Sequence, residues 1–501
     1  MSNPTDEIIR AMPTSSATDA AAIQKAYDFA EVAHGNEKRK SGEPYINHPR
    51  AIAIELAKLG MDRDTIIAGI LHDTVEDTPV TPEEIEEKFG PTVRFLVDGV
   101  TKLSKLKYQG LERHVESLRR LLVATANDIR VIIIKLADRL HNMQTIEFVA
   151  PEKQRRIASE TMEIYVPIAE RLGMSAVKSE LQDLSYAVLD PEGYKATLKT
   201  LEAKREEMEK GLSETLKDLK RALGEAGIRN FQTEMRVKGT YSFAKKLEEK
   251  EGNIERVYDL FALRAIVPTV GDCYRLLGLV HGLWRPVLGR VKDYIAVPKP
   301  NGYRSIHTTV ITGNGVIVEV QIRTEEMHRE SQYGIASHFN YEGMGKKQTS
   351  SVNWIRSLLP SLKKRAEKTG DPQVTVPSWL KDLTEIDAEN PDHEAFQEAL
   401  HEDFFAERMF TFTPKGDVID LPVGATPADF AYAVHTSVLD SMMGARVNGK
   451  MVSLDTPLKN GDKVEIVTKK GGKPNKKWLD MVKTTRAKRH IRNALKKGDK
   501  N

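Results

Sequence analysis

Residues 71–78, LHDTVEDT, place an imidazole beside a carboxylate and add two more acids one helical turn further on. If residues 65–77 form one helix, His72 and Glu76 share one face and Asp73 and Asp77 share the next, because residues four apart are neighbours on a helix. Imidazole and carboxylate groups gathered in this way can bind a metal ion, or each can serve as an ordinary helix cap or ion-pair partner. This stretch alone leaves both interpretations open.

Two residues from elsewhere in the chain complete a possible set of metal ligands. His48 follows a turn-forming SGEP at 41–44, and Asp138 lies in a strongly apolar helical segment, where an unpaired carboxylate would be costly. An ion pair with Arg139 is the alternative for Asp138. Taken together, the donors form a mixed nitrogen and oxygen set that suits Mn²⁺ or another octahedral divalent ion, and such an ion can activate water. The members of this set are His48, His72, Asp73 and Asp138.

A second group of candidate residues concentrates cations. The segment RVKGTYSFAKK at 236–246 is rich in Arg and Lys, while Asp259 and Glu319 place carboxylates on two predicted strands. Cations and acids at strand ends suit phosphoryl transfer, and salt bridges on a sheet surface are the alternative. No GxxxxGK[ST] sequence occurs, so any phosphates must be held by side chains rather than by a P-loop.

The apolar spacing predicts which elements position these residues. Residues 20–189 show a helical period throughout, and 194–226 form a charged connecting helix. Strands are predicted at 257–267, 293–297 and 315–323, and residues 408–468 predict a β-grasp fold with one helix at 427–436. We therefore expect a multidomain protein with an all-α domain, an α/β domain and a small β-grasp domain. The predicted boundaries are 1–18 (disordered), 19–190 (all-α), 191–342 (α/β with connecting helices), 343–405 (helical linker), 406–468 (β-grasp) and 469–501 (basic segment).

Composition narrows the class of protein. The 501 residues are 40% hydrophobic and 29% charged, and no apolar run approaches the roughly 18 residues that span a bilayer, so we expect no membrane protein. Cys273 is the only cysteine, which excludes internal disulfides and cysteine-based zinc fingers and favours a cytoplasmic location. The net charge is only +3, but residues 469–501 carry thirteen Lys or Arg against two Asp, a local field that favours phosphates or RNA.

The segments RKSGEPYINH (39–48), HDTVED (72–77) and DRLHN (138–142) resemble the HD hydrolase of the Rel/Spo family, which makes and destroys the alarmones ppGpp and pppGpp. The resemblance implies that a Mn²⁺ ion binds to the four-residue set above, that Glu76 and Asp77 help activate water, and that the 3′-pyrophosphate is hydrolysed. It also implies nucleotide contacts from Arg39, Lys40, Ser41 and Asn142.

The segments KDYIAVPKPNGYRSIH (292–307) and VEVQIRT (318–324) resemble the pyrophosphokinase domain of the same family. The implied reaction moves the β,γ-pyrophosphate of ATP to the 3′-OH of GDP or GTP, with Mg²⁺. The resemblance assigns adenine stacking to Arg236, guanine stacking to Tyr303, and metal binding and the acceptor hydroxyl to Asp259 and Glu319. It assigns further substrate contacts to Lys238, Ser242, Lys246, Lys292, Lys299, Asn301, His307 and Gln321.

The segments MFTFTPKGD (409–417) and ADFAYAVHT (428–436) resemble a TGS domain, a β-grasp module shared with threonyl-tRNA synthetases and certain GTPases. In ribosome-bound relatives this module meets the tRNA acceptor end, which would place His435 near the terminal CCA; a helix-end histidine is the alternative. Long members of the family continue into further regulatory domains, so we expect a truncated or shortened form here.

These observations predict a bifunctional alarmone synthetase and hydrolase. The intact His72–Asp73 pair and the basic RVKD at 290–293 favour two working sites, and we expect helices near 150–200 to couple them. One alternative is a (p)ppGpp hydrolase whose synthetase site is degraded. Another is a tRNA-binding or ribosome-binding regulator that acts through residues 408–501.

Overall fold

The computed structural model describes residues 3–104, 128–257, 260–299, 301–313, 315–337, 408–469, 472 and 474–498. The chain divides into two units, one formed by residues 1–105 with 127–374 and the other by 106–126 with 375–501. Each unit is treated separately below. Within the described ranges, no helix is both long enough and apolar enough to cross a membrane.

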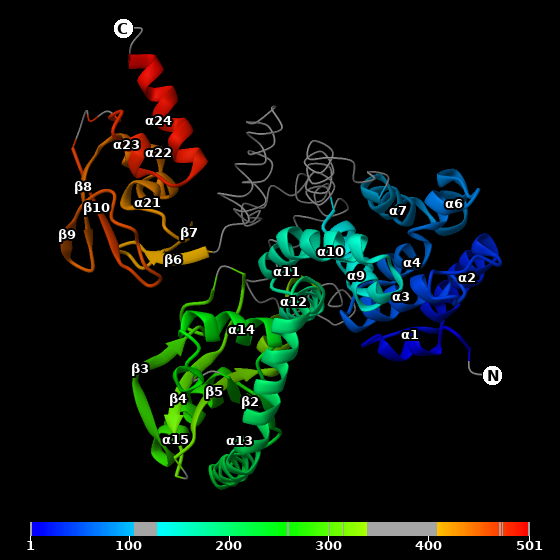
Figure 1. Cartoon of the computed structure of the whole chain (residues 1–501), viewed down its shortest axis with the longest axis horizontal. Coiled ribbons are helices and arrows are strands. Elements are labelled where there is room, and N and C mark those ends of the chain that lie inside the picture. Colours follow the sequence, from blue (N-terminus) through cyan, green and yellow to red (C-terminus); the bar gives the residue numbers. More distant parts are fainter. Residues whose placement is uncertain are drawn as a thin grey trace. The chain divides into compact units, whose positions relative to one another are not determined.

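The first part of the first unit is entirely helical over the residues that are described, as its apolar period predicts (Figure 1). Its core is built from Ile, Leu, Val and Ala side chains of α3, α4, α7 and α9. The helices are α1 (Asp6–Ala11), α2 (Ala17–His34), α3 (Asn47–Lys58), α4 (Arg63–Leu71), α5 (Thr74–Asp77), α6 (Pro82–Phe89), α7 (Pro91–Ser104), α9 (Arg130–Gln144), η1 (Ile146–Phe148), α10 (Pro151–Glu160), η2 (Thr161–Tyr165), α11 (Val166–Arg171) and α12 (Ser175–Leu189).

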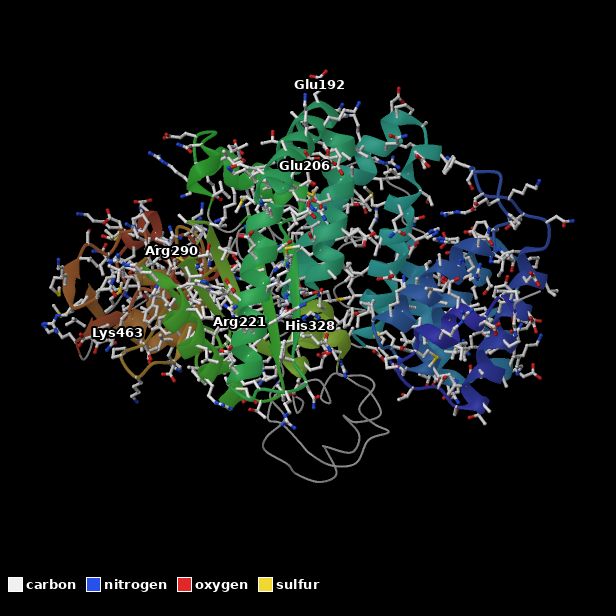
Figure 2. All side chains as sticks on the ribbon, turned by 90° about the horizontal axis from the view of Figure 1, so that it is seen from below. Glu192, Glu206, Arg221, Arg290, His328 and Lys463 are labelled. Carbon is white, nitrogen blue, oxygen red and sulfur yellow. The ribbon has the colours of Figure 1, made fainter. Side chains whose placement is uncertain are left out.

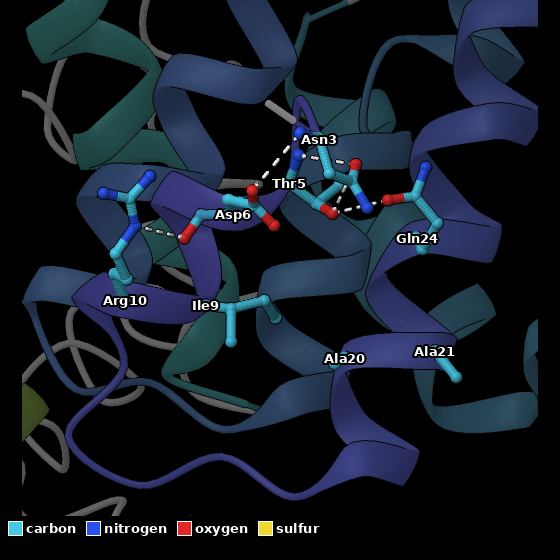
Figure 3. Close-up of a pocket in the computed structure, with 8 residues that line it drawn as sticks. All are labelled: Asn3, Thr5, Asp6, Ile9, Arg10, Ala20, Ala21 and Gln24. Carbon is cyan, nitrogen blue, oxygen red and sulfur yellow. Dashed lines mark hydrogen bonds between the residues drawn. The ribbon is translucent and has the colours of Figure 1, made fainter. Parts of the chain in front are cut away.

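The N-terminal residues differ from the disorder expected for residues 1–18. Helix α1 forms because Ile8 is fully buried against the rest of the unit, where α1 contacts α3. The Thr5 hydroxyl donates to Gln24 Oε1 of α2, beside an open pocket of about 390 Å³ (Figure 3). Apolar burial and this side-chain contact fix the segment, although its Ser, Thr and Pro content suggests a loose tail.

The helix considered over residues 65–77 is interrupted at His72 and Asp73. Helix α4 ends at Leu71, and α5 starts at Thr74. His72 and Asp73 keep right-handed backbone angles between them, and the Asp77 N–H still donates to Asp73 O at 2.9 Å. The backbone therefore stays close to helical across the break, and His72 is buried there.

A long helix leads into the second half of this unit. Helix α13 (Pro191–Glu225) buries one side, with Leu201, Leu212, Leu219 and Leu223, against the sheet domain. Exposed charged side chains follow its length, among them Glu192, Glu206 and Arg221 (Figure 2). This confirms the charged connecting helix that the sequence predicts.

The sheet domain contains five strands in the order β1-β2-β5-β4-β3. Strands β2 and β5 are parallel, and every other neighbouring pair is antiparallel. Helices α14, α15 and α16 complete the domain (Figure 1). The elements are β1 (Gln232–Val237), α14 (Thr240–Glu249), η3 (Ile254–Arg256), β2 (Phe261–Val267), α15 (Val270–Leu283), β3 (Arg285–Asp293), β4 (Ile306–Ile311), β5 (Ile317–Thr324) and α16 (Glu325–Tyr333).

The strand expected at residues 293–297 is a turn, and the real strand, β3, ends where the prediction begins. The carboxylate of Asp293 accepts hydrogen bonds from the backbone N–H groups of Ile295 (3.0 Å) and Ala296 (2.9 Å). Such a side chain satisfies the backbone in place of a strand partner. The prediction was wrong here because local aspartate chemistry overrides the β propensity of Tyr, Ile and Val.

Helix α12 connects the helical and sheet parts of the first unit. It contacts α9, α10 and α11 as well as α13, α14 and α16. At its start, the backbone N–H of Ile335 donates to Leu172 O at 2.9 Å. Gly334 has a φ of +55°, and a Cβ there would clash with the Leu172 carbonyl oxygen, so glycine is required at this junction.

The second unit shows the short strands and helix that the β-grasp prediction requires. Strands β10, β8 and β9 form one sheet and β6 pairs with β7. The Asn448-Gly449 turn has positive φ angles of 53° and 83°, as a tight hairpin between β8 and β9 demands. The elements are β6 (Arg408–Phe412), β7 (Val418–Pro422), α21 (Pro427–Val434), α22 (Thr436–Asp440), β8 (Met442–Val447), β9 (Lys450–Val452), β10 (Val464–Thr468), α23 (Trp478–Met481) and α24 (Thr485–Gly498).

The basic C-terminal segment is part of this unit's core. Trp478, Val482, Ala487 and Ile491 pack with apolar side chains of α21, α22 and β8. Asp429 of α21 anchors the segment, because its carboxylate accepts the backbone N–H groups of Lys483 and Thr484 at 2.9–3.1 Å. It also accepts the Thr484 hydroxyl at 2.8 Å.

Asp429→Ala should loosen the second unit. Removing the carboxylate, which is 1% exposed, leaves buried donors unsatisfied and should cost about 3 kcal/mol. Amide hydrogen exchange of peptides from residues 408–498 would show the loss as faster exchange. The exposed Asp455→Ala is the matched control, and equal protection in both variants would contradict the anchoring role.

Candidate functional sites

Four side chains predicted to bind a metal converge in the helical domain. His48 comes from α3, Asp138 from α9, and His72 and Asp73 from the break between α4 and α5. Ligand atoms of His48, His72 and Asp138 all lie within 4.8 Å of one another. His48 Nε2 lies 3.4 Å from Asp138 Oδ1 and 3.6 Å from Asp73 Oδ2, and His72 Nε2 lies 2.9 Å from Asp73 Oδ1. The structure therefore places the four predicted side chains side by side, and their binding of a metal stays a prediction.

Neighbouring groups orient the ligand atoms. His72 Nδ1 lies 2.9 Å from Gly69 O, a contact that requires a proton on Nδ1 and leaves a lone pair on Nε2. That Nε2 is buried and has no hydrogen-bond partner in the part of the chain that the structure describes, even though a carboxylate oxygen of Asp73 lies near it. Asp138 is held through one oxygen by Lys135 Nζ (2.7 Å) and through the other by Asn142 Nδ2 (2.6 Å). An orphaned imidazole nitrogen facing two carboxylates fits a divalent cation.

Electrostatics keeps these carboxylates charged. Burial alone would raise the pKa of Asp138, but the ammonium of Lys135 and the contact with His48 hold it well below its usual range. Burial lowers the pKa of His48, which favours the neutral imidazole that a metal requires. Burial would also lower the pKa of His72, but the charge of Asp73 beside it raises the pKa instead. A bound cation would oppose that rise.

The other hydrolase candidates surround this cluster. Arg39, between α2 and α3, reaches Asn142 Oδ1 at 2.9 Å, whereas Lys40 next to it is exposed and Ser41 is half-buried. Glu76 and Asp77 lie on α5, one turn beyond the ligands. The sequence reasoning missed the role of Tyr45, whose hydroxyl donates to Asp73 Oδ2 at 2.8 Å and approaches Asp77 Oδ2 at 3.0 Å. Tyr45 lies within the RKSGEPYINH motif at 39–48, and this position could have marked it as a site residue.

Several synthetase candidates share one face of the five-stranded sheet. Residues that pair across neighbouring strands point to the same side of a sheet. One row runs through Arg236, Ala262, Glu319 and Thr309, and the adjacent row through Glu234, Arg264, Gln321, His307 and Lys292. The opposite face carries Leu263, Ala265, Val320 and Ile322, which are buried in the core with α13 and α15. The sheet thus has one polar face, which carries charged and hydrogen-bonding side chains, and one apolar face.

A chain of hydrogen bonds crosses the polar face. The Tyr303 hydroxyl lies 2.6 Å from His307 Nε2, His307 Nδ1 lies 3.1 Å from Glu319 Oε1, and Gln321 Nε2 donates to Glu319 Oε2 at 2.8 Å. Burial would raise the pKa of Glu319, but these contacts with His307 and Gln321 and the charge of Lys292 lower it to about 2. Glu319 is therefore a persistent carboxylate in this site.

The remaining candidates lie around this face. Lys299 Nζ lies 4.9 Å from the ring centroid of Tyr294 and 5.2 Å from that of Tyr303, and burial lowers its pKa. Asn301 lies on the same exposed loop. Lys238 follows β1, and Ser242 and Lys246 lie on α14. Asp259 lies outside the described residues, so its position stays a prediction.

Two buried arginines were missed by the sequence reasoning. Arg264 interrupts the otherwise apolar strand β2, which was the signal available for it, whereas Arg323 lies on β5 beside other polar residues. Arg323 is fully buried, and among the described residues none of its three guanidinium nitrogens has a hydrogen-bond partner. Burial and the nearby charge of Arg264 lower the pKa of Arg323 to about 10. Uncompensated positive charge at this depth favours an anionic ligand on the polar face.

His435 lies at the junction of α21 and α22. Its ring is exposed, and Nδ1 accepts the backbone N–H of Ser437 at 3.1 Å, which caps α22. The helix-end role considered from the sequence is therefore present, and the tRNA contact stays a prediction.

Comparison with known proteins places three domains on the chain. Residues 26–175 match the HD domain, 235–346 match a region found in RelA and SpoT proteins, and 409–468 match the TGS domain. A GTP pyrophosphokinase of Streptomyces coelicolor is 46% identical over 94% of this chain and 55% of its own length. A guanosine-3′,5′-bis(diphosphate) 3′-pyrophosphohydrolase of Aquifex aeolicus is 44% identical over 95% of this chain and 65% of its own length.

A third relative unites the two activities in its name. The bifunctional (p)ppGpp synthase/hydrolase SpoT of Escherichia coli is 41% identical over 95% of this chain and 64% of its own length. The chain thus spans between about half and two thirds of the length of these curated relatives.

Mn²⁺ should stabilise the helical domain by binding to the His48 cluster, the group formed by His48, His72, Asp73 and Asp138. A ligand that binds only the folded state at 100 times its Kd adds about 2.7 kcal/mol of stability. The midpoint of thermal unfolding should rise with Mn²⁺ and return to its metal-free value with a chelator. His72→Ala should remove the rise, and an equal rise in that variant would place the metal elsewhere.

The low pKa of Glu319 predicts a dependence of stability on pH. A carboxyl whose pKa falls from its ordinary value of 4.5 to about 2 on folding stabilises the protein above the higher value, and this contribution disappears as the pH falls toward the lower one. The free energy of unfolding of the wild type, relative to Glu319→Gln, should therefore decrease between about pH 5 and pH 3. A difference that stays constant over this range would exclude the shift.

Proposed function

We propose that this chain, which belongs to the Rel/Spo family by its HD, RelA/SpoT and TGS domains, both makes and hydrolyses (p)ppGpp. Synthesis transfers pyrophosphate from ATP to the 3′-OH of GDP or GTP, and hydrolysis returns GDP or GTP and pyrophosphate. The observation that carries the proposal is that the first unit holds two separate polar sites, the His48 cluster and the polar face of the sheet.

The hydrolase half depends on a set of groups arranged around the His48 cluster. When bound there, Mn²⁺ supplies positive charge that activates water and offsets the charge of the leaving pyrophosphate. Asp77, fixed near Asp73 by the Tyr45 hydroxyl, and Glu76 on the same short helix are the groups we assign to accept the proton of the attacking water. Arg39, Lys40, Ser41 and Asn142 form the side that we assign to the nucleotide.

The synthetase half depends on the polar face of the sheet. We assign Arg236 and Tyr303 to stacking on adenine and guanine, and Lys238, Lys246 and Lys299 to the ATP phosphates. The unpartnered guanidinium of Arg323 adds positive charge that supports binding of a highly charged donor. In this way the face can hold two nucleotides with the acceptor hydroxyl near the donor phosphates.

Glu319 has a more specific place in this proposal. A carboxylate whose pKa is about 2 is a poor proton acceptor but a good ligand for a hard cation. We therefore assign Glu319 first to Mg²⁺ and second, with His307, to the acceptor 3′-hydroxyl. Mg²⁺ supplies charge that offsets the phosphates, and Asp259 is its second proposed ligand.

The location and partners follow from the remaining modules. We propose the cytoplasm, where GDP, GTP and ATP are available. The TGS domain, with the cationic helix α24 packed into the same unit, supports contact with tRNA on the ribosome, and His435 is the residue we assign to the acceptor end.

The two sites should be separable by single substitutions. With Mn²⁺ and ppGpp, His72→Ala should lose hydrolysis by at least about 10²-fold, because one ligand is missing, and should still form alarmone from ATP and GDP with Mg²⁺. Glu319→Gln should show the reverse pattern. Chromatography of labelled guanosine nucleotides measures both reactions.

Each variant is the control for the other, since both keep the rest of the chain. Absence of alarmone formation in the wild type would contradict the synthetase half of the proposal. Hydrolysis that survives in His72→Ala would contradict the assignment of the cluster.

A further inference from the structure

Arg39 is held against α9 by three polar contacts. Its Nη1 lies 3.1 Å from His141 Nδ1 and 3.3 Å from Thr145 Oγ1, and its Nη2 lies 2.9 Å from Asn142 Oδ1. His141 and Asn142 lie on α9, one helical turn after the buried Asp138. A planar guanidinium that donates from two nitrogens fixes both partners in one geometry.

The contact between Arg39 and His141 affects the orientation of His48. A guanidinium can only donate, so His141 Nδ1 accepts from Arg39. His48 Nδ1 lies 2.9 Å from the same His141 Nδ1, so the proton of that contact resides on His48. An imidazole protonated on Nδ1 carries its lone pair on Nε2, and His48 Nε2 faces Asp138 and Asp73 at 3.4 and 3.6 Å. The contacts from Arg39 to His141 and from His141 to His48 thus select the tautomer of His48 that can bind a metal.

The contact between Arg39 and Asn142 affects the orientation of Asp138. Asn142 Oδ1 accepts from Arg39, which turns the amide Nδ2 toward the carboxylate. Nδ2 donates to Asp138 Oδ1 at 2.6 Å, the same oxygen that faces His48 Nε2. The Arg39 guanidinium therefore orients two of the predicted metal ligands, His48 through the His141 side chain and Asp138 through the Asn142 side chain.

We propose that Arg39, His141 and Asn142 form a brace that sets the orientation of His48 and Asp138 before any nucleotide arrives. His141 is a positioning residue, which no sequence motif singled out for a role. Arg39 and Asn142 act on metal affinity as well as on the nucleotide. The inference rests on the metal site of the proposed hydrolase, but it concerns metal binding alone.

The test measures Mn²⁺ binding without nucleotide, from the decrease of the electron paramagnetic resonance signal of free Mn²⁺. His141→Leu removes the acceptor and should weaken Mn²⁺ affinity by about 10- to 100-fold, the usual effect of losing a group that orients a ligand. His141→Asn restores an acceptor near the position of Nδ1 and should recover most of the affinity. Arg39→Met should weaken Mn²⁺ binding in the same direction as His141→Leu.

Arg50→Met is the matched control. Arg50 lies on α3 two residues after His48, and its guanidinium pairs with Glu7 at 2.8 Å, away from the cluster. This variant should bind Mn²⁺ as the wild type does. Thermal unfolding in the absence of metal tests the fold of each variant, and Arg39→Met and His141→Asn keep the test open if His141→Leu does not fold.

Wild-type Mn²⁺ affinity in folded His141→Leu, or an Arg39→Met variant that changes only the KM for nucleotide, would overturn the brace. The outcome is independent of the proposed activity. A protein that binds Mn²⁺ in a His141-dependent manner but does not hydrolyse ppGpp would refute the hydrolase assignment and leave the brace intact.

Discussion

The buried charge of Asp138 is the constraint on which the helical domain depends. A carboxylate on an apolar helix is stable only if its lost hydration is replaced. Lys135 and Asn142 supply partners from the same helix, one turn before and one turn after. His48 and His72 arrive from other helices, and their pKa values shift in opposite directions because only His72 has the Asp73 carboxylate directly against Nε2. The packing of α3, α4 and α9 is therefore also the construction of the site.

The sheet domain solves a different problem, since it must carry many polar groups without losing its core. Strand alternation provides the solution, because it sends Leu263, Ala265 and Val320 to one side and Arg264, Glu319 and Gln321 to the other. The apolar side packs on α13 and α15 and keeps the strands in register. That register sets the spacing of the polar face, so the apolar and the polar sides of each strand depend on each other.

Much of this could be predicted from the sequence, because helical periodicity and short motifs are local signals. The four candidate metal ligands, and the choice of Glu319, Gln321 and His307 as residues of one substrate site, came from such motifs. The break at His72, the turn after Asp293 and the burial of α1 were not, since each depends on a contact that periodicity does not encode. Tyr45, His141 and Arg323 escaped notice because their importance lies in what they face across the fold.

The junction at Leu172 limits how the first unit can be divided. The sheet domain is tied to the helical domain by the continuous chain through α12 and α13 and again by the backbone hydrogen bond from Ile335, with Gly334 pressed against the Leu172 carbonyl. A double attachment resists the free swivelling that a single hinge permits. A fragment cut near residue 190 would lose this second tether and expose the α12-facing sides of α14 and α16, so excised halves are poor substitutes for the intact chain.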